Sequence, residues 1–279
     1  MEDREKFIKD EVHKHYEDLN KLGFGDVFAI FLQGSQNYGM DEYTDEYKSD
    51  VDTKAIIVPS LDEILSSDRK PYSSVYVRED NSHIDIKDVR TMFEMFKKQN
   101  TSYIELLFTD YYIVNPKYQK FFDELMAMRE DIARYNTNLH LTALCGSAHN
   151  KFLAMTHISP HSEEKIKKFG YDPKELHHLM RYLDLEQKYI KGCGYKECLT
   201  PSDPEFLMNV KKGKIYTSEE AIKVGQETDE RIKELRDKNL ITPDPINTET
   251  GDKLNSILRR ILIYSLKSNL KNEENWYHG

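Results

Sequence analysis

The sequence has no long apolar run and few cysteines. No apolar stretch approaches the roughly 20 residues needed to cross a bilayer, and "MEDREKFIKDEVHKHYEDL" at the start lacks the apolar centre of a signal peptide. Three cysteines in 279 residues are typical of a protein that functions in a reducing compartment. We therefore expect a cytoplasmic protein that makes no membrane contact.

A zinc site is not indicated either. Cys193 and Cys198 lie in "GCGYKEC", near His177 and His178. The usual two-residue spacing and a second cysteine pair are missing, however. A loop with two free thiols is the simpler interpretation.

Positive charge is also scarce in one half of the chain. The net charge is −9, but residues 1–138 hold 18 Lys and Arg against 28 Asp and Glu, whereas residues 139–279 hold 22 against 21. A dedicated duplex-binding protein is usually basic overall, so this balance weighs against one. It still permits binding of a nucleotide or of nucleic acid by the second half.

Apolar periodicity predicts a mixed α/β unit followed by a helical unit. An amphipathic helix over residues 3–22 precedes two buried strands, "DVFAIFLQG" and "VDTKAIIV", and the alternating strand "SHIDIKD" leads into a helix, "DVRTMFEMFKKQN". Four long helical patterns follow, at 138–159, 173–190, 217–238 and 252–270. The predicted class is α+β, with a small mixed β-sheet core, flanking helices and a C-terminal helical domain. The predicted domains are residues 1–130 and 131–279.

Two aspartates open the second strand. Asp50 and Asp52 flank Val51, and in an extended chain residues i and i+2 share one face. Two adjacent carboxylates are rarely tolerated unless a cation or a shared proton offsets their repulsion. Taken alone, the pair also fits ordinary turn residues at a strand start.

A glycine-serine turn leaves the first strand. Gly34 lets the backbone approach a ligand closely, and Ser35 offers a hydroxyl and an amide to phosphate oxygens. A helix opened by Ser35 through "QNYGM" would add its positive N-terminal end. A third acid is expected on the strand "SHIDIKD". Asp85 is favoured, because Asp88 fits the N-cap of the following helix.

Three carboxylates that face a phosphate-binding turn provide the oxygen ligands that Mg²⁺ needs, with Mn²⁺ as the alternative ion. Two such ions activate an attacking hydroxyl and stabilise a leaving pyrophosphate. Asp50, Asp52 and Asp85 are therefore the predicted metal-binding and catalytic residues, with Asp85 as a candidate base. Lys54, on the face of Asp52, is a candidate nucleotide-binding residue together with Gly34 and Ser35.

The order of these motifs resembles the DNA polymerase β-type nucleotidyltransferase superfamily. "GSQNYG", "SDVDTKAI" and "HIDIKDVRTMFEMFKKQNTSYIELLF" are most similar to a bacterial and phage branch of predicted nucleotidyltransferases linked to RNA repair, and "GYDPKELHHLMRYL" resembles a helical segment of that branch. The resemblance covers roughly residues 25–220. Fourteen residues separate Ser35 from Asp50, slightly more than the family's usual spacer, and the polar excess indicates a surface excursion.

The resemblance implies that a helix of the second half closes over the nucleotide. Lys174, His178 and Arg181 share one face of the predicted helix and are candidate contacts to the triphosphate or the acceptor. An exposed helix face is the alternative interpretation of the same residues.

The expected function is a metal-dependent transfer of NMP from an NTP to an acceptor hydroxyl. The acceptor that the resemblance implies first is an RNA 3′ end, with a protein side chain as the alternative. A catalytically inactive nucleotide-binding sensor or interaction module of the same fold, and a metal-dependent phosphohydrolase, are the competing hypotheses. The sequence predicts neither the preferred base nor the oligomeric state.

Overall fold

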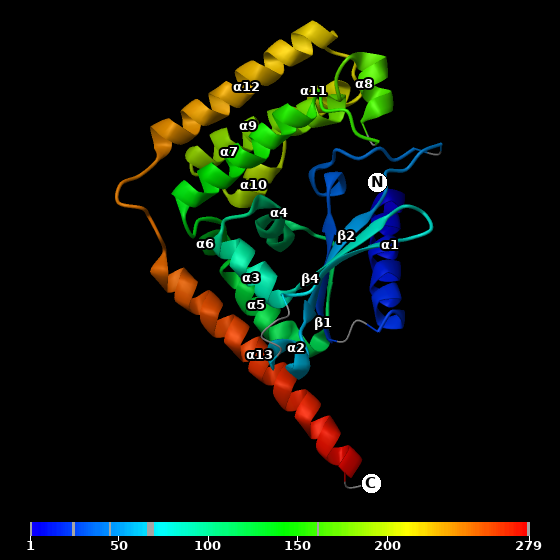
Figure 1. Cartoon of the computed structure of the whole chain (residues 1–279), viewed down its shortest axis with the longest axis vertical. Helices are drawn as coiled ribbons and strands as arrows, with labels where there is room; N and C mark the ends of the chain where they lie inside the picture. The colour runs from blue at the N-terminus through cyan, green and yellow to red at the C-terminus, as the bar shows by residue number, and fades with distance from the viewer. Residues whose placement is uncertain (1, 24–25, 45, 66–69, 161, 278–279) are drawn as a thin grey trace. The chain divides into compact units, whose positions relative to one another are not determined.

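The chain forms two compact units, each with its own core (Figure 1). The structure is a computed structural model that describes residues 2–23, 26–44, 46–65, 70–160 and 162–277. The first unit comprises Met1–Lys97, Ser102–Ile132 and Asn247–Gly279, and the second comprises Lys98–Thr101 and Ala133–Ile246. The predicted α+β class is confirmed. The predicted boundary between two domains at residue 130 stays a prediction. The last helix, α13 (Thr248–Tyr277), clusters with the first unit.

A five-stranded mixed sheet forms the centre of the first unit. Its strands are β1 (Asp26–Gln33), β2 (Asp52–Val58), β3 (Ser73–Val77), β4 (His83–Asp88) and β5 (Tyr112–Val114). They lie in the order β3-β4-β2-β1-β5. Among the described strands, β2 and β4 pair in parallel, whereas β1 is antiparallel to both β2 and β5 and β3 is antiparallel to β4. The central strands are buried on both faces, which explains their continuous apolar runs.

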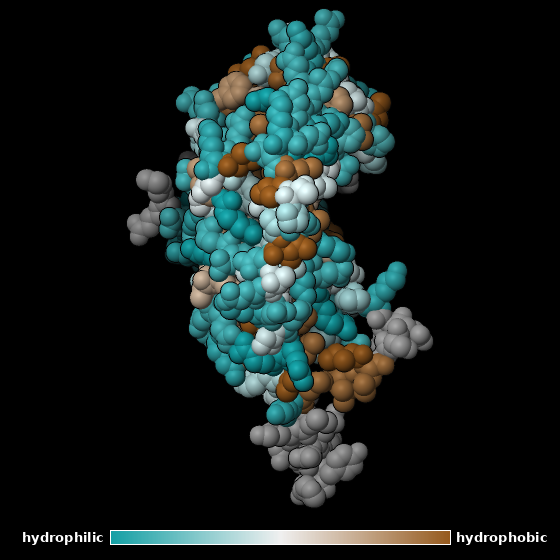
Figure 2. Space-filling model, turned by 90° about the vertical axis from the view of Figure 1, so that its left-hand side faces the viewer, coloured by the Kyte–Doolittle hydropathy of each residue, from teal (hydrophilic) through white to brown (hydrophobic). Residues whose placement is uncertain are grey.

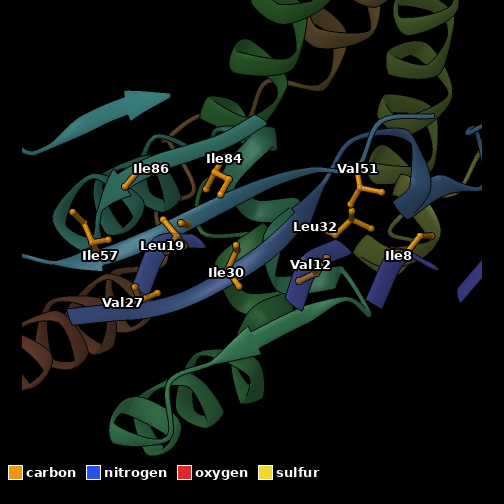
Figure 3. Packing of buried hydrophobic residues seen from close by; sticks show 11 residues of the cluster. Ile8, Val12, Leu19, Val27, Ile30, Leu32, Val51, Ile57, Ile84 and Ile86 are labelled. Atoms are coloured by element: carbon orange, nitrogen blue, oxygen red, sulfur yellow. The ribbon is translucent and has the colours of Figure 1, made fainter. Parts of the chain in front are cut away.

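One face of the sheet packs against α1 (Glu2–Lys21). Alternation along β1, β2 and β4 sends one set of side chains toward this helix (Figure 3), and the buried members of the cluster are Ile8, Val12, Leu19, Val27, Ile30, Leu32, Val51, Ala55, Ile57, Ile84 and Ile86. A polar contact joins the same layers: the buried His15 ring lies 2.8 Å from the Thr53 hydroxyl and 3.1 Å from that of Ser82. Burial, with the nearby Arg78 charge, lowers the pKa of His15 to about 4, so this imidazole is neutral.

Helices cover the opposite face. The helix α3 (Val89–Lys97) packs on β2 and β4, and α13 packs against α3, β2 and α5 (Gln119–Ala127). Aromatic rings fill this layer, with Phe31 of β1 beside Tyr112 and Phe122. The remaining short elements of this part of the chain are α2 (Leu61–Leu65), α4 (Thr101–Ile104), η2 (Glu105–Phe108), η3 (Pro116–Tyr118) and α6 (Arg129–Ala133). The stretch "LDEILSS" predicts a short helix here, and α2 is seen as far as Leu65, while residues 66 and 67 lie outside the described residues.

The described residues of the second unit form helices and the loops between them. The helices are α7 (Thr137–Ala154), α8 (Glu163–Phe169), α9 (Pro173–Ile190), α10 (Tyr195–Leu199), α11 (Pro204–Lys211) and α12 (Ser218–Asn239). Sequence signals mark several starts: the side chains of Asn136, Asp172 and Asp203 cap α7, α9 and α11, and Thr217 with Glu220 forms a capping box before α12. Mutual packing of α7, α9 and α12 forms the core of this unit.

A carboxylate is enclosed in this helical unit. Glu186 of α9 has 0 % of its surface exposed, and neither carboxylate oxygen has a hydrogen-bond partner among the described residues. Burial raises its pKa to about 8, although Arg236 and Arg231 act in the opposite direction. The pKa of Glu186 is thus higher in the folded protein than its unfolded value of 4.5. The contribution of this group to the free energy of unfolding is therefore fully present below pH 4.5, and it is lost as the pH rises through about 8.

We therefore expect Glu186→Gln to stabilise the protein at pH 8 and to flatten the fall in stability between pH 5 and 8. Urea unfolding of both proteins at several pH values measures this. The matched control is Glu227→Gln on the exposed surface of α12, which is expected to keep the wild-type pH dependence. A Glu186→Gln profile parallel to that of the wild type would contradict the assignment.

The outer surface agrees with the low mean hydropathy of −0.73. The face seen in Figure 2 is mainly hydrophilic, with apolar side chains in a few small groups. Among the described helices, none combines the length and the apolar character required to cross a bilayer.

Candidate functional site

The turn after β1 needs a glycine. Gly34 has φ 99° and ψ −157°, a region of backbone conformation that is essentially restricted to glycine. Ser35 follows, but it opens only a four-residue 3₁₀ helix, η1 (Ser35–Tyr38), which Gly39 ends in the left-handed conformation. The expected helix therefore begins at Ser35 as predicted, but it ends at Tyr38 and does not continue to Met40, and a helix of four residues adds only a weak positive N-terminal end. Close backbone approach and the Ser35 hydroxyl remain as the features that fit phosphate.

Side chains of the turn anchor it to its surroundings. Gln36 donates a hydrogen bond of 2.5 Å to the backbone carbonyl of Asp50, so the turn is joined directly to the paired acids. Asn37 donates to the carbonyl of Leu32 at 3.1 Å, and the Tyr38 hydroxyl donates to the buried carboxylate of Glu105. These contacts explain why amide and phenol side chains follow the glycine. They hold the turn against β1, β2 and η2.

Replacement of Gly34 by Ala is expected to destabilise the protein by about 1–3 kcal/mol, because a Cβ atom is strained at this φ and ψ. Space is not the cause, since the nearest atom to the added Cβ, the Gln36 side-chain oxygen, is 3.7 Å away. Chemical denaturation measures the effect. The comparison variant is Gly146→Ala in α7, where an added Cβ meets nothing within 4 Å. Equal stability of Gly34→Ala and the wild type would contradict the strain.

The two aspartates lie beside this turn. Asp52 pairs with Gln33, the residue that ends β1, while Val51 between the acids is buried in the core under α1. Asp50 is exposed and the Asp52 side chain is 44 % exposed, so solvent and ligands can reach both carboxylates. The excursion before Asp50 is a small surface hairpin, closed by a bridge between Tyr43 and Lys48.

A hollow of about 210 Å³ adjoins Asp50 on the side of α1. Besides Asp50, its wall includes the acids Glu11 and Asp80 and the cation Lys48. Arg78 partly matches these acids, with its Nη1 atom 2.9 Å from Asp80 and 3.4 Å from Glu11. The net negative charge of this hollow disfavours a triphosphate. The other face of β2 carries the cation Lys54.

Asp85 lies on that other face but contacts lysines. Its Oδ2 atom is 2.5 Å from the Lys54 ammonium and its Oδ1 atom is 2.9 Å from that of Lys87. Burial opposes the charge, but the hydrogen bonds from Lys54 and Lys87 outweigh it and lower the pKa of Asp85. Lys54 is only 4 % exposed and also lies 4.6 Å above the Tyr103 ring. Asp85 and Lys54 therefore form an ion pair in this structure.

Asp88, the other candidate for the third acid, has a structural role. It is 1 % exposed, and its Oδ1 atom accepts a hydrogen bond of 2.7 Å from the backbone amide of Arg90 at the start of α3. The Arg90 guanidinium also pairs with its carboxylate at 2.6 Å. These contacts match the capping role that the sequence indicates for Asp88.

His83 lies next to Asp52. Register places Thr53 opposite Ile84, so Asp52 and His83 are neighbours across the parallel strand pair. The Asp52 Oδ1 atom accepts from the His83 backbone amide at 2.9 Å and lies 3.2 Å from its Nδ1 atom. In the alternating strand "SHIDIKD", His83 falls on the same polar face as Asp85, but no motif in the sequence marks it as functional. In the described part of the chain, no three His, Cys, Asp or Glu side chains stand close enough together to hold a metal ion.

The candidate nucleotide-binding helix of the second unit is α9. Lys174 is exposed, His178 is half-buried and Arg181 is 7 % exposed, with its guanidinium 5.4 Å from the Tyr182 ring. His177, which precedes His178 in α9, is 1 % exposed. Burial lowers its pKa to about 3, and the positive charges of Arg181 and Lys211 act in the same direction. Burial and neighbouring charge also lower the pKa of His178 well below its usual range. This helix therefore combines cations with neutral imidazoles.

A mixed sheet with a glycine-serine turn beside paired strand-start carboxylates defines the class of polymerase β-type nucleotidyltransferases. The chain belongs to the RNA repair pathway DNA polymerase beta family, whose model matches residues 10–192. Among solved structures, it is similar to a nucleotidyltransferase-like protein from Exiguobacterium sibiricum 255-15, with 9 % identity and a TM-score of 0.28 over 83 % of this chain and 75 % of that one. No curated protein matches.

Proposed function

We propose that the chain transfers NMP from an NTP to an acceptor hydroxyl. The observation that carries this proposal is the hydrogen bond from Gln36 to the Asp50 carbonyl, which joins the glycine turn to the carboxylate pair Asp50 and Asp52. In the reaction, a bond forms between the acceptor oxygen and the α-phosphorus. The bond between that phosphorus and the oxygen bridging to the β-phosphate breaks, pyrophosphate leaves, and the acceptor proton passes through a carboxylate of the site to water.

The accessible carboxylates fit a divalent cation of the Mg²⁺ class. Such ions take hard oxygen ligands and are usually held by one or two carboxylates together with substrate phosphates. Asp50 and Asp52 would supply the carboxylates, both of which are accessible to solvent. A cation held there would neutralise charge on the triphosphate.

The chain's own residues position the nucleotide in this proposal. Gly34 and Ser35 present backbone and hydroxyl to phosphate oxygens beside Asp52. Lys54 supplies positive charge beneath the same face of β2, matched at present by Asp85. On α9, the cations Lys174 and Arg181 with the neutral His178 are proposed to contact the triphosphate or the acceptor.

RNA is the acceptor that the family's description supports, so we propose a 3′-terminal hydroxyl of RNA as the attacking group. A protein hydroxyl is the alternative acceptor. The acidic first half of the chain, with its net charge of −10 over residues 1–138, favours the recognition of an end over tight binding along a strand.

Incubation with each α-labelled NTP, a divalent cation and an RNA oligonucleotide tests the proposal. The expected result is pyrophosphate release with label transferred to the RNA. The matched control is the same RNA with a 3′-phosphate, which removes the attacking hydroxyl and is expected to abolish transfer.

Other outcomes separate the competing functions. Nucleotide binding without pyrophosphate release, with RNA or with protein acceptors, would contradict the transferase and favour an inactive nucleotide-binding module. Release of free phosphate would instead indicate a phosphohydrolase. Label on the chain itself or on added protein would retain the transferase and overturn the RNA acceptor.

A further inference from the structure

Three segments of the first unit form the hollow beside Asp50. Its walls consist of Phe7 and Glu11 of α1, residues 48–51 before β2, and Asp80 and Ser82 of the turn between β3 and β4. Its volume of about 210 Å³ is below the roughly 300–1,000 Å³ of a pocket that encloses a drug-sized ligand. The hollow therefore has room for one sugar ring and its substituents, but not for a whole nucleoside triphosphate.

Two acids of the hollow already have cationic partners. The Arg78 Nη1 atom lies 2.9 Å from Asp80 Oδ2 and 3.4 Å from Glu11 Oε2. The Lys14 ammonium is 2.6 Å from the other oxygen of Glu11. Asp80 also accepts hydrogen bonds from the backbone amide and the hydroxyl of Ser82, at 3.0 and 2.6 Å. These contacts leave little of the acidic charge for a cationic ligand.

Asp50 and Lys48 carry the remaining charges, which have opposite signs. Asp50 is exposed, and among the described residues its carboxylate has neither a hydrogen-bond donor nor an ion-pair partner. The exposed Lys48 ammonium lies 4.6 Å from the centre of the Phe7 ring and 4.8 Å from that of the Tyr43 ring, and no described carboxylate pairs with it. A ligand in the hollow therefore meets one acceptor of hydrogen bonds and one cation, two residues apart in the chain.

A ribose that carries a phosphate on its 5′ side fits this arrangement. Its 2′- and 3′-hydroxyls can donate to the two oxygens of a carboxylate, and its phosphate can pair with an ammonium. The Phe7 ring and the Val51 side chain in the wall offer an apolar surface to the C–H groups of the sugar. A triphosphate carries several negative charges against one lysine, and a basic peptide would find Glu11 and Asp80 already paired. The end of an RNA strand, with one phosphate next to its terminal sugar, is thus the favoured ligand.

We propose that the hollow binds the 3′-terminal nucleotide of the acceptor RNA, with the ribose hydroxyls donating to Asp50 and the phosphate on the 5′ side paired with Lys48. The inference deepens the proposed nucleotidyl transfer and rests on it, because the RNA end is the second substrate of that reaction. A carboxylate has lone pairs for more than one partner, so Asp50 can accept from the RNA and still hold a cation. Lys48 and Phe7 thereby become acceptor-binding residues, whereas Gly34 and Ser35 serve the NTP.

Steady-state kinetics with an RNA oligonucleotide test the role of Lys48. Lys48→Met removes the charge but keeps an unbranched side chain, and it is expected to raise the KM for RNA by about tenfold while the KM for the NTP stays unchanged. Lys48→Arg retains the charge and is expected to keep most of the RNA affinity. The matched control is Lys9→Met, which is expected to behave like the wild type, because the Lys9 side chain is 64 % exposed on α1 and does not line the hollow.

Removal of one hydroxyl from the RNA tests the contact with Asp50 without any change to the protein. The same oligonucleotide with a 2′-deoxyribose at its 3′ end keeps the attacking hydroxyl but loses one donor to the carboxylate. The KM of the wild type for this RNA is expected to rise by about tenfold. RNA with a 2′-deoxyribose at the preceding nucleotide is the control, and its KM is expected to equal that of unmodified RNA.

Photo-crosslinking locates the RNA end independently of catalysis. An RNA with 4-thiouridine as its 3′-terminal nucleotide is irradiated with the full chain, and the cross-linked peptides are identified by mass spectrometry. Cross-links are expected within residues 7–11, 48–51 or 80–82, which line the hollow. Their yield is expected to fall in Lys48→Met but not in Lys9→Met.

The outcomes separate this inference from the proposed function. Transfer to RNA with an unchanged acceptor KM in Lys48→Met, and with cross-links outside the hollow, would overturn the inference and leave the transferase in place. Cross-links in the hollow without pyrophosphate release from any NTP would contradict the proposed transfer and support the hollow as a site for an RNA end. Label on a protein acceptor alone, without cross-links to RNA, would overturn RNA as the occupant.

Discussion

The variant with both Asp50→Asn and Asp52→Asn is expected to lose nucleotidyl transfer by on the order of 10³-fold or more, because the site would lose both carboxylates that hold its cation. Asn keeps nearly the same shape but carries no charge, and both residues are accessible. The fold should therefore persist. Pyrophosphate release under single-turnover conditions measures the loss, and circular dichroism reports whether the fold is retained.

A second pair of neutral substitutions on the same unit controls for the change in net charge. Asp10→Asn with Asp62→Asn, on the exposed surfaces of α1 and α2, removes the same two negative charges and is expected to keep wild-type activity. Transfer that survives in the variant at 50 and 52 would place the activity at another site. Equal loss in both double variants would show that net charge matters and that the carboxylate pair does not.

Asp85→Asn is expected to lower the free energy of unfolding by about 3 kcal/mol, because it leaves the Lys54 ammonium buried without its main counter-ion. Lys54→Met is expected to cost less, since Asp85 keeps Lys87 at 2.9 Å. The two changes together should restore much of the stability, because no buried charge is then left unmatched. Urea denaturation of the wild type, both single variants and the double variant gives the coupling energy of the pair.

If Asp85 is a cation ligand and not the counter-ion of Lys54, stability and Mn²⁺ binding will respond differently to Asp85→Asn. An Asp85→Asn variant with wild-type stability that has lost Mn²⁺ binding would make Asp85 a cation ligand, as the strand pattern first indicates. A variant that is less stable but binds Mn²⁺ normally supports the Lys54 partnership. The two measurements together assign Asp85 to one role.

Local sequence patterns were sufficient for most elements of the fold. The three- and four-residue apolar steps before residue 22 correspond to α1, the runs before Gly34 and Pro59 correspond to β1 and β2, and the strict alternation around Ile84 corresponds to β4. These patterns work because each element buries one face or both in a regular repeat. The same strand predictions indicated that Gly34 lies near Asp50 and Asp52, because β1, which ends before Gly34, pairs with β2, which begins at Asp52.

The sequence was insufficient where contacts depend on strand register. Alternation put His83, Asp85 and Lys87 on one face, but it did not show that β4 runs parallel to β2 with His83 beside Asp52. A shift of two residues along β4 would keep the same face and bring Asp85 to that position. The ion pair of Lys54 with Asp85 could not be predicted either, because it depends on the same register of β2 and β4. The length of the helix after Ser35 was also missed, because Tyr38 turns back to Glu105.

A crystal structure of the wild-type chain with Mn²⁺ and a non-hydrolysable NTP tests the central claim most directly. The account predicts an anomalous Mn²⁺ peak within bonding distance of the Asp50 and Asp52 carboxylates, with the triphosphate beside Gly34 and Ser35. A nucleotide bound elsewhere, with no ion at these two carboxylates, would contradict it.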